Sequence, residues 1–453
     1  MGLAYSEALA QLLHIAQRQG SSRSAPQRHV PLWESTGGIV AHNLACPKSI
    51  PEYDTSAMDG YAINSAATTG AAPETPVLFR VEGTLAAGDH PRTLLRPTAD
   101  TDDQVEPCIE IMTGAIFPEF GPKGKPYDAC VKVEDTVLVD GGPPQAHSDR
   151  HILVTKPVAP NANKRFANSD IRKGDVILSR GEIVGPSHIM SLAAVGLESI
   201  PLVRKPRMAI FSTGRELVNG QGATRDANGP YITAAAREMG LDVDFLGIVD
   251  DDAVSLHCQV EKMANSGLYD LVITSGAVSK GKFDHVRHVL EQLNAEIVFH
   301  GLAIRPGHPV LFALLPAKDA RKTAFFGLPG NPGAAAACFR FLTVPYLRAL
   351  QGQPAERPIL ARLSSPPGAS QPKPAQPTDC FRHGIVSISL EGQLTVQPSA
   401  DQSPAKLGPL LSANCWIHFK PDSSPPPASP ALLVECYPLS PTGILNLQPS
   451  YPN

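Results

Sequence analysis

The sequence lacks the features of a membrane-spanning or secreted protein. None of its apolar runs reaches the roughly 18 residues that a membrane-spanning helix needs. No basic N-terminal region leads into an apolar segment, as it would in a secretory signal. We therefore expect neither a membrane span nor a secretory signal.

The sequence also lacks an excess of charge of either sign. Its 39 Lys and Arg stand against 43 Asp and Glu, so the formal net charge of the 453 residues is −4. A protein that binds nucleic acid or an acidic membrane mainly through charge carries a basic surface. The balance of charge therefore argues against both as the main partner.

Paired cysteines are missing as well. The eight cysteines are scattered along the chain, and they form no CxxC pair and no Cys/His metal spacing. This distribution is typical of reduced thiols in the cytoplasm rather than of a disulfide framework or a zinc site. We therefore expect a cytoplasmic protein.

Two common phosphate-binding fingerprints are absent, because no GxxxxGK[ST] and no GxGxxG follows a predicted strand. The sequence has instead an alternation of strands and helices from residue 206 to 352, which predicts a parallel or mixed sheet with helices on both faces. The predicted strands are 208–211, 243–249, 271–274, 297–304, 310–314 and 324–327. The predicted helices are 228–239, capped by Asn228, about 253–265, and 284–293.

A chain of 453 residues is too long for one core and should divide into several domains. Residues of about 4–18 have the apolar stripe of a helix, and those of about 49–145 have the short alternating runs of a β-rich insert. After residue 352 a Pro-rich stretch leads to short predicted strands at 384–390, 394–397 and 415–419.

Gly-rich or acidic groups follow five of the predicted strands in the 206–352 region. Carboxyl ends of strands form the ligand crevice of an open α/β sheet, and small residues there let backbone N–H groups approach an anion. We therefore expect an anion site, although such loops also use Gly and Ser simply to turn. The groups are Ser212-Thr213-Gly214, Asp250-Asp251-Asp252, Ser275-Gly276, Pro306-Gly307 and Leu328-Pro329-Gly330.

Charged residues form a second set of candidates. Carboxylates suit a Mg²⁺ ion that holds a phosphate chain. Each could equally be a solvated surface acid or a helix cap, as Asp284 in particular could be. Arg305 and His308 flank a Pro-Gly turn and could bind an oxyanion, or they could be solvated loop residues. The candidate carboxylates are Asp59, Asp170, Glu216, Asp251 and Asp284.

Several motifs together resemble the molybdopterin molybdenumtransferase family, which includes bacterial MoeA and the E domain of gephyrin. The resemblance covers residues of about 31–420 and is highly specific, because no other family known to us strings these motifs together. The motifs are Ser56-Ala57-Met58-Asp59-Gly60-Tyr61-Ala62, Met112-Thr113-Gly114-Ala115, Thr213-Gly214-Arg215-Glu216-Leu217 and Leu328-Pro329-Gly330-Asn331-Pro332.

The resemblance implies an elongated four-domain subunit. It would have a central doubly wound α/β domain at 186–352, a β-rich inserted domain at 49–145, and a C-terminal β domain at 353–453. A small linking and dimerisation domain would combine 1–48 with 146–185. It also implies a homodimer whose active cleft lies between the α/β domain of one chain and the β domains of the other.

The implied reaction joins molybdate to adenylated molybdopterin and gives molybdenum cofactor and AMP, with Mg²⁺ or another divalent cation. No fused adenylating domain is recognisable, so we expect a separate adenylating enzyme as a partner. The resemblance assigns the five candidate carboxylates to catalysis, and Glu216 and Asp251 to the metal. Substrate contacts are assigned to Thr113, Ser275, Gly276, Ser279, Arg305, His308, Pro309, Arg382 and Ser403.

Several positions depart from the family pattern, and most of the changes fall at the expected oxyanion end. Ala277 stands in place of a Gly, and Asn168-Ser169 in place of the Gly-Glu of a Gly-Glu-Asp run. Arg215 stands in place of an Asp, Arg305 and His308 in place of two Lys, and Ala334 in place of a Ser. Two alternatives to a working molybdate insertase therefore stay open. One is a divergent paralogue with altered oxyanion specificity that acts on another adenylated or phosphorylated substrate. The other is a non-catalytic scaffold like the gephyrin E domain.

Overall fold

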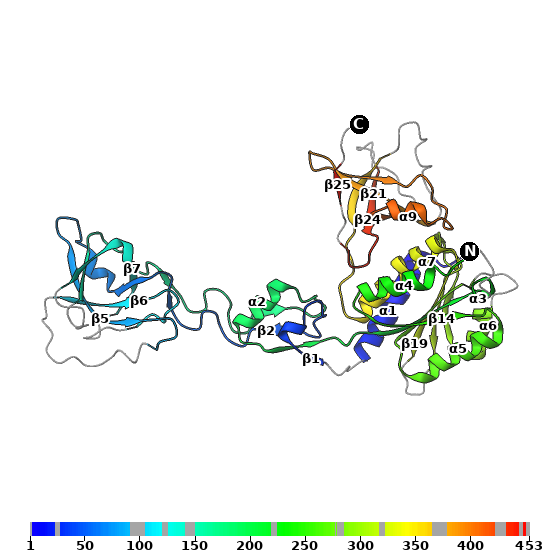
Figure 1. Ribbon diagram of the computed structural model, residues 1–453, viewed down its shortest axis with the longest axis horizontal. Helices are drawn as coiled ribbons and strands as arrows, with labels where there is room; N and C mark the ends of the chain where they lie inside the picture. The colour runs from blue at the N-terminus through cyan, green and yellow to red at the C-terminus, as the bar shows by residue number, and fades with distance from the viewer. Residues whose placement is uncertain are drawn as a thin grey trace. The chain divides into compact units, whose positions relative to one another are not determined.

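The computed structural model describes twelve stretches of the chain. They form two compact units, each described here by itself: 1–42, 180–184 and 199–453 belong to the first unit, and 43–179 with 185–198 to the second (Figure 1). No helix within the described stretches is long and apolar enough to cross a membrane. The described residues are 2–22, 28–90, 105–119, 126–140, 150–218, 224–276, 278, 285–316, 322–364, 378–421, 432–443 and 447–449.

The first unit is built on a six-stranded mixed sheet with the order β14-β13-β15-β19-β18-β16. The first four of these strands run parallel, and β18 and β16 each run antiparallel to their neighbours. The parallel strands β15 and β19 are buried along their whole length, as the continuous apolar runs in the sequence predict. The strands are β13 (Arg207–Thr213), β14 (Asp242–Val249), β15 (Leu271–Ser275), β16 (Glu296–His300), β18 (Leu311–Leu315) and β19 (Thr323–Leu328).

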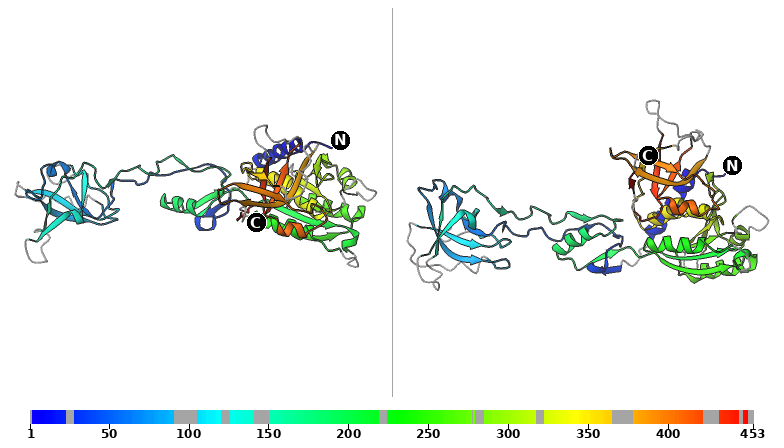
Figure 2. Two further views of the ribbon diagram at one scale, coloured as in Figure 1. Left: turned by 90° about the horizontal axis from the view of Figure 1, so that it is seen from above. Right: turned by 45° about the horizontal axis from the view of Figure 1, so that its top comes forward.

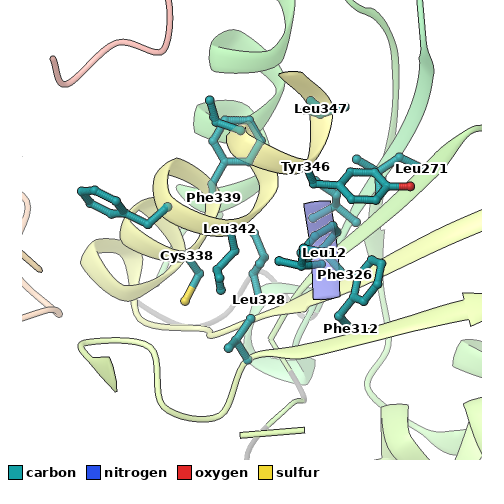
Figure 3. Packing of buried hydrophobic residues seen from close by; sticks show 14 of the residues in the cluster. Leu12, Leu271, Phe312, Phe326, Leu328, Cys338, Phe339, Leu342, Tyr346 and Leu347 are labelled. Carbon is teal, nitrogen blue, oxygen red and sulfur yellow. The ribbon is translucent and has the colours of Figure 1, made fainter. Parts of the chain in front are cut away.

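Helices cover both faces of this sheet, so the predicted doubly wound architecture is confirmed. Alternate residues of β13 point to opposite faces of the sheet. Met208 and Ile210 belong to the core formed with α1, α4, α7 and α8. Ala209 and Phe211 belong to the core formed with α5 and α6. Figure 3 shows Leu12 of α1 in the first core, together with Phe326 of β19. The helices are α1 (Tyr5–Ser22), α3 (Arg215–Val218), α4 (Asn228–Glu238), α5 (Ala253–Ser266), α6 (His285–Gln292), α7 (Pro332–Cys338) and α8 (Val344–Leu350).

The C-terminal region of the first unit forms a second sheet that closes on itself. Strand β21 pairs with β22 on one side and with β23 on the other, and β20 and β24 complete the ring. A short helix, α9 (Gly408–Ser412), precedes β23. The strands are β17 (Ile304–Arg305), β20 (Ile359–Leu363), β21 (Asp379–Ile388), β22 (Leu394–Pro398), β23 (Cys415–Phe419), β24 (Leu433–Pro438) and β25 (Gln448–Pro449).

The prediction of one strand over 297–304 was wrong. Strand β16 ends at His300, because Gly301 follows with a φ of +89° that a continuous strand does not adopt. Strand β17 begins at Ile304 and pairs in parallel with β21 of the closed sheet. Pro306-Gly307 therefore follows a strand of the closed sheet, and not of the α/β sheet as expected.

The second unit contains a six-stranded sheet with the order β7-β4-β6-β5-β9-β8. Side chains of this sheet, including Tyr61, Phe79 and Ile152, form a core of their own. Figure 2 shows the ribbon of this sheet in two further views. The sheet continues past residue 145 into β9, while the four predicted domain boundaries stay predictions. The strands are β4 (Gly60–Ile63), β5 (Val77–Leu85), β6 (Glu106–Ile111), β7 (Ala129–Lys132), β8 (Thr136–Asp140) and β9 (Arg150–Val154).

Shorter elements complete the two units. The second unit also holds α2 (Pro186–Ala194). Two-stranded pairs join the remaining short strands. Those of the second unit are β3 (Thr55–Ser56) with β10 (Lys164–Arg165) and β2 (Leu44–Ala45) with β11 (Val176–Leu178); that of the first unit is β1 (Arg28–Pro31) with β12 (Ser199–Leu202).

Candidate functional site

A cavity of about 500 Å³ lies at the carboxyl ends of β13, β15 and β19. This is the rim where the sequence predicts an anion site, and four of the five expected groups contribute lining residues: the loops after these three strands, and Asp251 after β14. Pro309 lines the same cavity although its loop begins from the closed sheet. The predicted substrate contacts that line it are Ser275, Gly276 and Pro309, and the predicted acids are Glu216 and Asp251.

Gly276 allows the floor of the cavity to form. Its φ is +98°, and a Cβ there would lie 2.4 Å from the Thr213 carbonyl oxygen and 2.7 Å from its Oγ1. Only glycine fits this close approach between the ends of β15 and β13. The Gly276 Cα also lies 3.7 Å from the position of a Cβ on Gly330. The three strand ends therefore present mainly backbone and hydroxyl groups to the cavity.

Asn228 ties two of these loops together. Its Nδ2 donates to the Ser275 hydroxyl at 2.7 Å and to the Gly330 carbonyl at 2.8 Å. The Ser275 hydroxyl in turn donates to the Pro329 carbonyl at 3.2 Å. The expectation that Asn228 caps α4 was wrong: Asp226 Oδ1 accepts from both the Asn228 and Gly229 N–H groups, at 3.1 Å each. This leaves the Asn228 side chain available for the loops.

Two polar atoms of the cavity lining have no hydrogen-bond partner among the described residues. They are the Ser212 hydroxyl and Asp226 Oδ2, and both are buried. A Cβ on Gly229 would lie 2.7 Å from each of them, so the two atoms are close together. Buried polar atoms in a native protein are nearly always satisfied. The arrangement therefore favours a polar or charged ligand in this cavity.

Sequence reasoning placed Ser212 in one of the expected anion-site groups, but it did not select Asp226 or Asn228 as ligand residues. The available signal is the run Asp226-Ala227-Asn228 directly before a helix that follows a strand end. In such a run the acid can cap the helix, while the amide two positions later can hydrogen-bond to a neighbouring loop.

The acidic groups at the rim have different surroundings. Asp252 caps α5 by accepting from the Val254 and Ser255 N–H groups at 2.9 and 3.0 Å, and its hydrogen bonds with Ser255 hold the pKa of Asp252 below its ordinary range. Arg215 Nε lies 3.8 Å from Asp250 Oδ1 and 3.9 Å from Asp251 Oδ1. The guanidinium therefore offsets part of the negative charge that Asp251 brings to the cavity.

The donor chemistry fits a Mg²⁺ ion bound together with phosphate. Glu216 and Asp251 both line the cavity, and the buried Asp226 Oδ2, also in the lining, has no partner among the described residues. Within the described stretches, no three His, Cys, Asp or Glu side chains are grouped closely enough to hold a metal by themselves. Mg²⁺ commonly takes one or two carboxylates and completes its shell with water and substrate phosphate.

The predicted oxyanion residues come from three neighbouring segments of the first unit. Arg305 pairs with Cys380 in the β17–β21 ladder, and Arg382 lies two residues further along β21, on the same face as Cys380. His308 Nδ1 lies 2.5 Å from the Leu302 carbonyl oxygen, which places the proton on Nδ1 and leaves Nε2 toward solvent. Both Arg305 and His308 are exposed.

The segment that carries Ser403 docks against the start of α7. The Gly333 N–H donates to the Pro404 carbonyl at 2.7 Å, and the Ser403 N–H donates to Asp401 Oδ1 at 2.9 Å. Ala334, where the family pattern has a Ser, follows Gly333 and is buried. The structure thus brings the Ser403 segment to the position that lacks the hydroxyl.

The remaining predicted residues lie elsewhere. Asp59 and Thr113 belong to the second unit and contact each other, since Asp59 Oδ1 accepts from the Thr113 N–H at 2.7 Å and from its hydroxyl at 2.8 Å. These two bonds hold the pKa of Asp59 below its usual range. Asp170 also belongs to the second unit, where its N–H donates to the Ile50 carbonyl at 3.0 Å. Ser279 and Asp284 lie outside the described residues.

Comparison with known proteins gives the same family. The MoeA N-terminal region (domains I and II) matches residues 3–196, and a probable molybdopterin binding domain matches residues 209–349. A molybdopterin molybdenumtransferase of Synechococcus elongatus is 31% identical over 92% of this chain and 95% of its own. The chain belongs to the molybdopterin molybdenumtransferase family.

Further relatives agree with this membership. A molybdopterin molybdenumtransferase of Staphylococcus aureus is 28% identical over 87% of both chains. A solved structure of a MoeA protein from Pyrococcus horikoshii aligns with a TM-score of 0.71 and 27% identity, covering 97% of this chain and 99% of its own. All lining residues of the cavity fall between 212 and 332, inside the match to the molybdopterin binding domain.

Proposed function

We propose that this chain is a molybdopterin molybdenumtransferase, which inserts molybdate into adenylated molybdopterin and releases AMP. The observation that carries the proposal is the cavity at the strand ends. It combines glycine-lined backbone, buried polar atoms that have no partner among the described residues, and two carboxylates, all within the match to the molybdopterin binding domain. Such a site suits a phosphate chain with a divalent cation.

Roles follow from where the residues lie. The backbone around Gly276 and the hydroxyl of Ser212 bind and orient the diphosphate, because only small groups allow it to approach the strand ends this closely. Glu216 and Asp251 would hold Mg²⁺ or another divalent cation, with Asp284 as a further acid. The bound cation would neutralise charge that develops on the diphosphate when AMP leaves.

The segments around β17, β21 and α7 would bind the molybdate. Arg305 and Arg382 supply fixed positive charge for an oxyanion, and Ser403 supplies a hydroxyl. His308 can donate from Nε2 only when that nitrogen carries a proton, because Nδ1 is already engaged by Leu302.

We also propose a homodimer in which Asp59, Thr113 and Asp170 of one copy complete the cavity of the other. A separate enzyme would supply the adenylated substrate. A paralogue with another adenylated or phosphorylated substrate is the second candidate, favoured by one observation: Ala334 brings no hydroxyl to the segment where the oxyanion would bind.

Complementation of a strain deficient in molybdenum insertion tests the proposal. Nitrate reductase activity is measured at limiting and at high molybdate. Rescue at both concentrations, or at high molybdate alone, supports the insertase, and the second result points to the altered oxyanion residues. Absence of rescue by folded protein, together with no AMP release on addition of molybdate, contradicts it and favours the paralogue.

A further inference from the structure

The side chain of Gln402 bridges two strands of the closed sheet at the point where β22 ends. The β21–β22 ladder ends at the pair Gly384 and Pro398. The next pair would be His383 and Ser399, which would exchange two backbone bonds, and one of them is present: the Ser399 N–H donates to the His383 carbonyl at 3.0 Å. The Gln402 amide takes the place of the other bond. Its Oε1 accepts from the His383 N–H at 3.3 Å, and its Nε2 donates to the Ser399 carbonyl at 2.9 Å.

A further bond fixes the orientation of this amide. The Gln402 Nε2 also donates to the His383 carbonyl at 2.9 Å, so both of its hydrogens have acceptors. The His383 ring adds a link of its own, since its Nδ1 lies 2.9 Å from the Ser399 hydroxyl oxygen. Burial lowers the pKa of His383, which favours the neutral ring. Two uncharged side chains therefore join the end of β22 to β21.

Both neighbours of Ser403 in the sequence are anchored. Gln402 is bound to β21 and to the end of β22, and the Pro404 carbonyl accepts from the Gly333 N–H of α7 at 2.7 Å. The Ser403 backbone is engaged as well, because its N–H donates to Asp401 Oδ1 at 2.9 Å and its carbonyl accepts from an N–H three residues later at 3.1 Å. Its hydroxyl has no hydrogen-bond partner among the described residues. The segment thus holds Ser403 by its backbone and leaves the hydroxyl for a ligand.

The bridge joins the segments of two predicted oxyanion residues. Arg382 directly precedes His383 on β21, and Ser403 directly follows Gln402. Because the Gln402 amide bonds both backbone groups of His383, it fixes the Ser403 segment relative to the strand that carries Arg382. A primary amide is suited to this, since it is planar and offers donors and an acceptor as a peptide group does, without a charge.

We propose that Gln402 is a positioning residue for the oxyanion, whose amide holds Ser403 in place relative to Arg382. This rests on the proposed function and adds a residue outside the set of predicted substrate contacts. The amide is engaged by backbone groups of β21 and β22, so it acts through Ser403 and not by touching the oxyanion. Without it, the chain after β22 can separate from β21 and carry Ser403 with it. Binding of molybdate is then weakened, while the diphosphate cavity keeps its shape.

Steady-state kinetics of molybdate-dependent AMP release by the full-length protein test the inference with Gln402→Ala. The KM for molybdate should rise by about tenfold or more, because a group that binds the oxyanion is displaced. The KM for the adenylated substrate should stay within about twofold of the wild type, since the cavity proposed for its diphosphate is lined by residues between 212 and 332. Partial unfolding lowers the amount of active enzyme and leaves a KM unchanged, so it cannot produce this difference. The matched control Gln397→Ala, at an exposed position of β22, should leave both KM values as in the wild type.

Gln402→Glu gives a second readout, which is a pH profile. The introduced carboxylate would face the carbonyl oxygens of His383 and Ser399, so its protonated form should be favoured, and that form offers a donor and an acceptor as the amide does. The rise in the KM for molybdate, relative to the wild type, should therefore shrink as the pH falls from about 8 to about 6. The other titratable groups around the amide are His383 and the Asp401–Lys406 ion pair; the wild type shares them, so their titration cancels from the ratio.

Three results would overturn the inference. They are an unchanged KM for molybdate in Gln402→Ala, an equal rise in both KM values, and a defect of Gln402→Glu that does not depend on pH. Absence of AMP release by the wild type would instead contradict the proposed function. Wild-type activity together with any of the three results leaves the insertase in place and removes Gln402 from the oxyanion site.

Discussion

Asn228 and Ser275 are 47 positions apart in the sequence, and a hydrogen bond of 2.7 Å joins the Asn228 amide to the Ser275 hydroxyl. The same amide donates to the Gly330 carbonyl at 2.8 Å, a further 55 residues along the chain. One side chain at the start of α4 therefore fixes the loops after β15 and β19 relative to each other. These loops are two sides of the candidate diphosphate cavity, so the position of Asn228 should matter for both folding and activity.

Asn228→Ala should disorganise this cavity. Removing the amide leaves the Gly330 carbonyl and the buried Ser275 hydroxyl without their donor, which costs about 1–3 kcal/mol of unfolding free energy. Insertion activity should fall by about tenfold or more, because the two loops are no longer held in position relative to each other. Urea unfolding and molybdate-dependent AMP release measure the two effects. An unchanged midpoint with full activity would contradict the proposed role.

Gly276→Ala should reduce stability and activity more than a Gly→Ala change at a position where the added Cβ meets no other atom. The added Cβ would lie 2.4 Å from the Thr213 carbonyl oxygen, and the φ of +98° is itself unfavourable for alanine. Gly240→Ala is the matched control, because Gly240 has a φ of +74° but nothing within 4 Å of the added Cβ. We expect thermal unfolding to show a loss in both variants, and AMP release to be lost only in Gly276→Ala.

Arg215→Asp should strengthen the binding of Mg²⁺. The guanidinium of Arg215 lies within 4 Å of a carboxylate oxygen of both Asp250 and Asp251, so it competes with a cation for their charge. Calorimetric titration with Mg²⁺ should give a several-fold lower dissociation constant for the variant, with the largest difference at low salt. Arg287→Asp, which changes an exposed arginine of α6, should leave Mg²⁺ binding as in the wild type. Equal Mg²⁺ affinity in all three proteins would remove Arg215 from the site.

Thr113→Val should raise the pH below which activity is lost. The Thr113 N–H and hydroxyl hold the pKa of Asp59 below its ordinary value of 3.8, so the carboxylate stays ionised in mild acid. A contribution from ionised Asp59 is present above the ordinary pKa and is lost as the pH falls through the lowered pKa. Valine removes only the hydroxyl bond, so the pKa of Asp59 should rise part of the way back. An NMR titration of the Asp59 carboxyl should detect this rise, and an unchanged titration would argue against the hydroxyl bond.

Ala334→Ser should lower the molybdate concentration needed for activity. Ala334 is buried at the start of α7, beside Gly333, whose N–H is bound to the Pro404 carbonyl next to Ser403. A hydroxyl here would add a donor where the oxyanion is proposed to bind. Rescue of nitrate reductase at limiting molybdate should improve, and Ala337→Ser, three residues later on α7, should give no improvement. A loss of rescue with stable Ala334→Ser protein would place molybdate elsewhere.

Most elements of the α/β sheet could be predicted because their signals are local. The apolar run at 208–211 and the stripe of α5 each reflect burial against one layer, which the period of the sequence reports directly. Strand β17 could not be predicted, because two residues become a strand only by pairing with β21, which begins 75 positions after Ile304. Such a pairing leaves no local period in the sequence.

The candidate site divides in the same way. Gly276, Glu216 and Asp251 could be expected at one rim, since parallel strands bring their carboxyl ends to the same edge of a sheet. Asp226 and Asn228 could not, because their importance comes from contacts with residues of other segments. The partnership of Asp59 with Thr113 was likewise invisible, although both motifs were recognised.

The sequence by itself determined the family, the class of fold and the edge of the sheet where a ligand should bind. It could do so because apolar periodicity, turn glycines and family motifs are properties of short segments. Only the tertiary structure decided which buried polar atoms have no partner among the described residues, and that the Asn228 side chain binds the loops after β15 and β19 and does not cap α4. Those features depend on distances between segments far apart in the chain, and only the packed fold sets such distances.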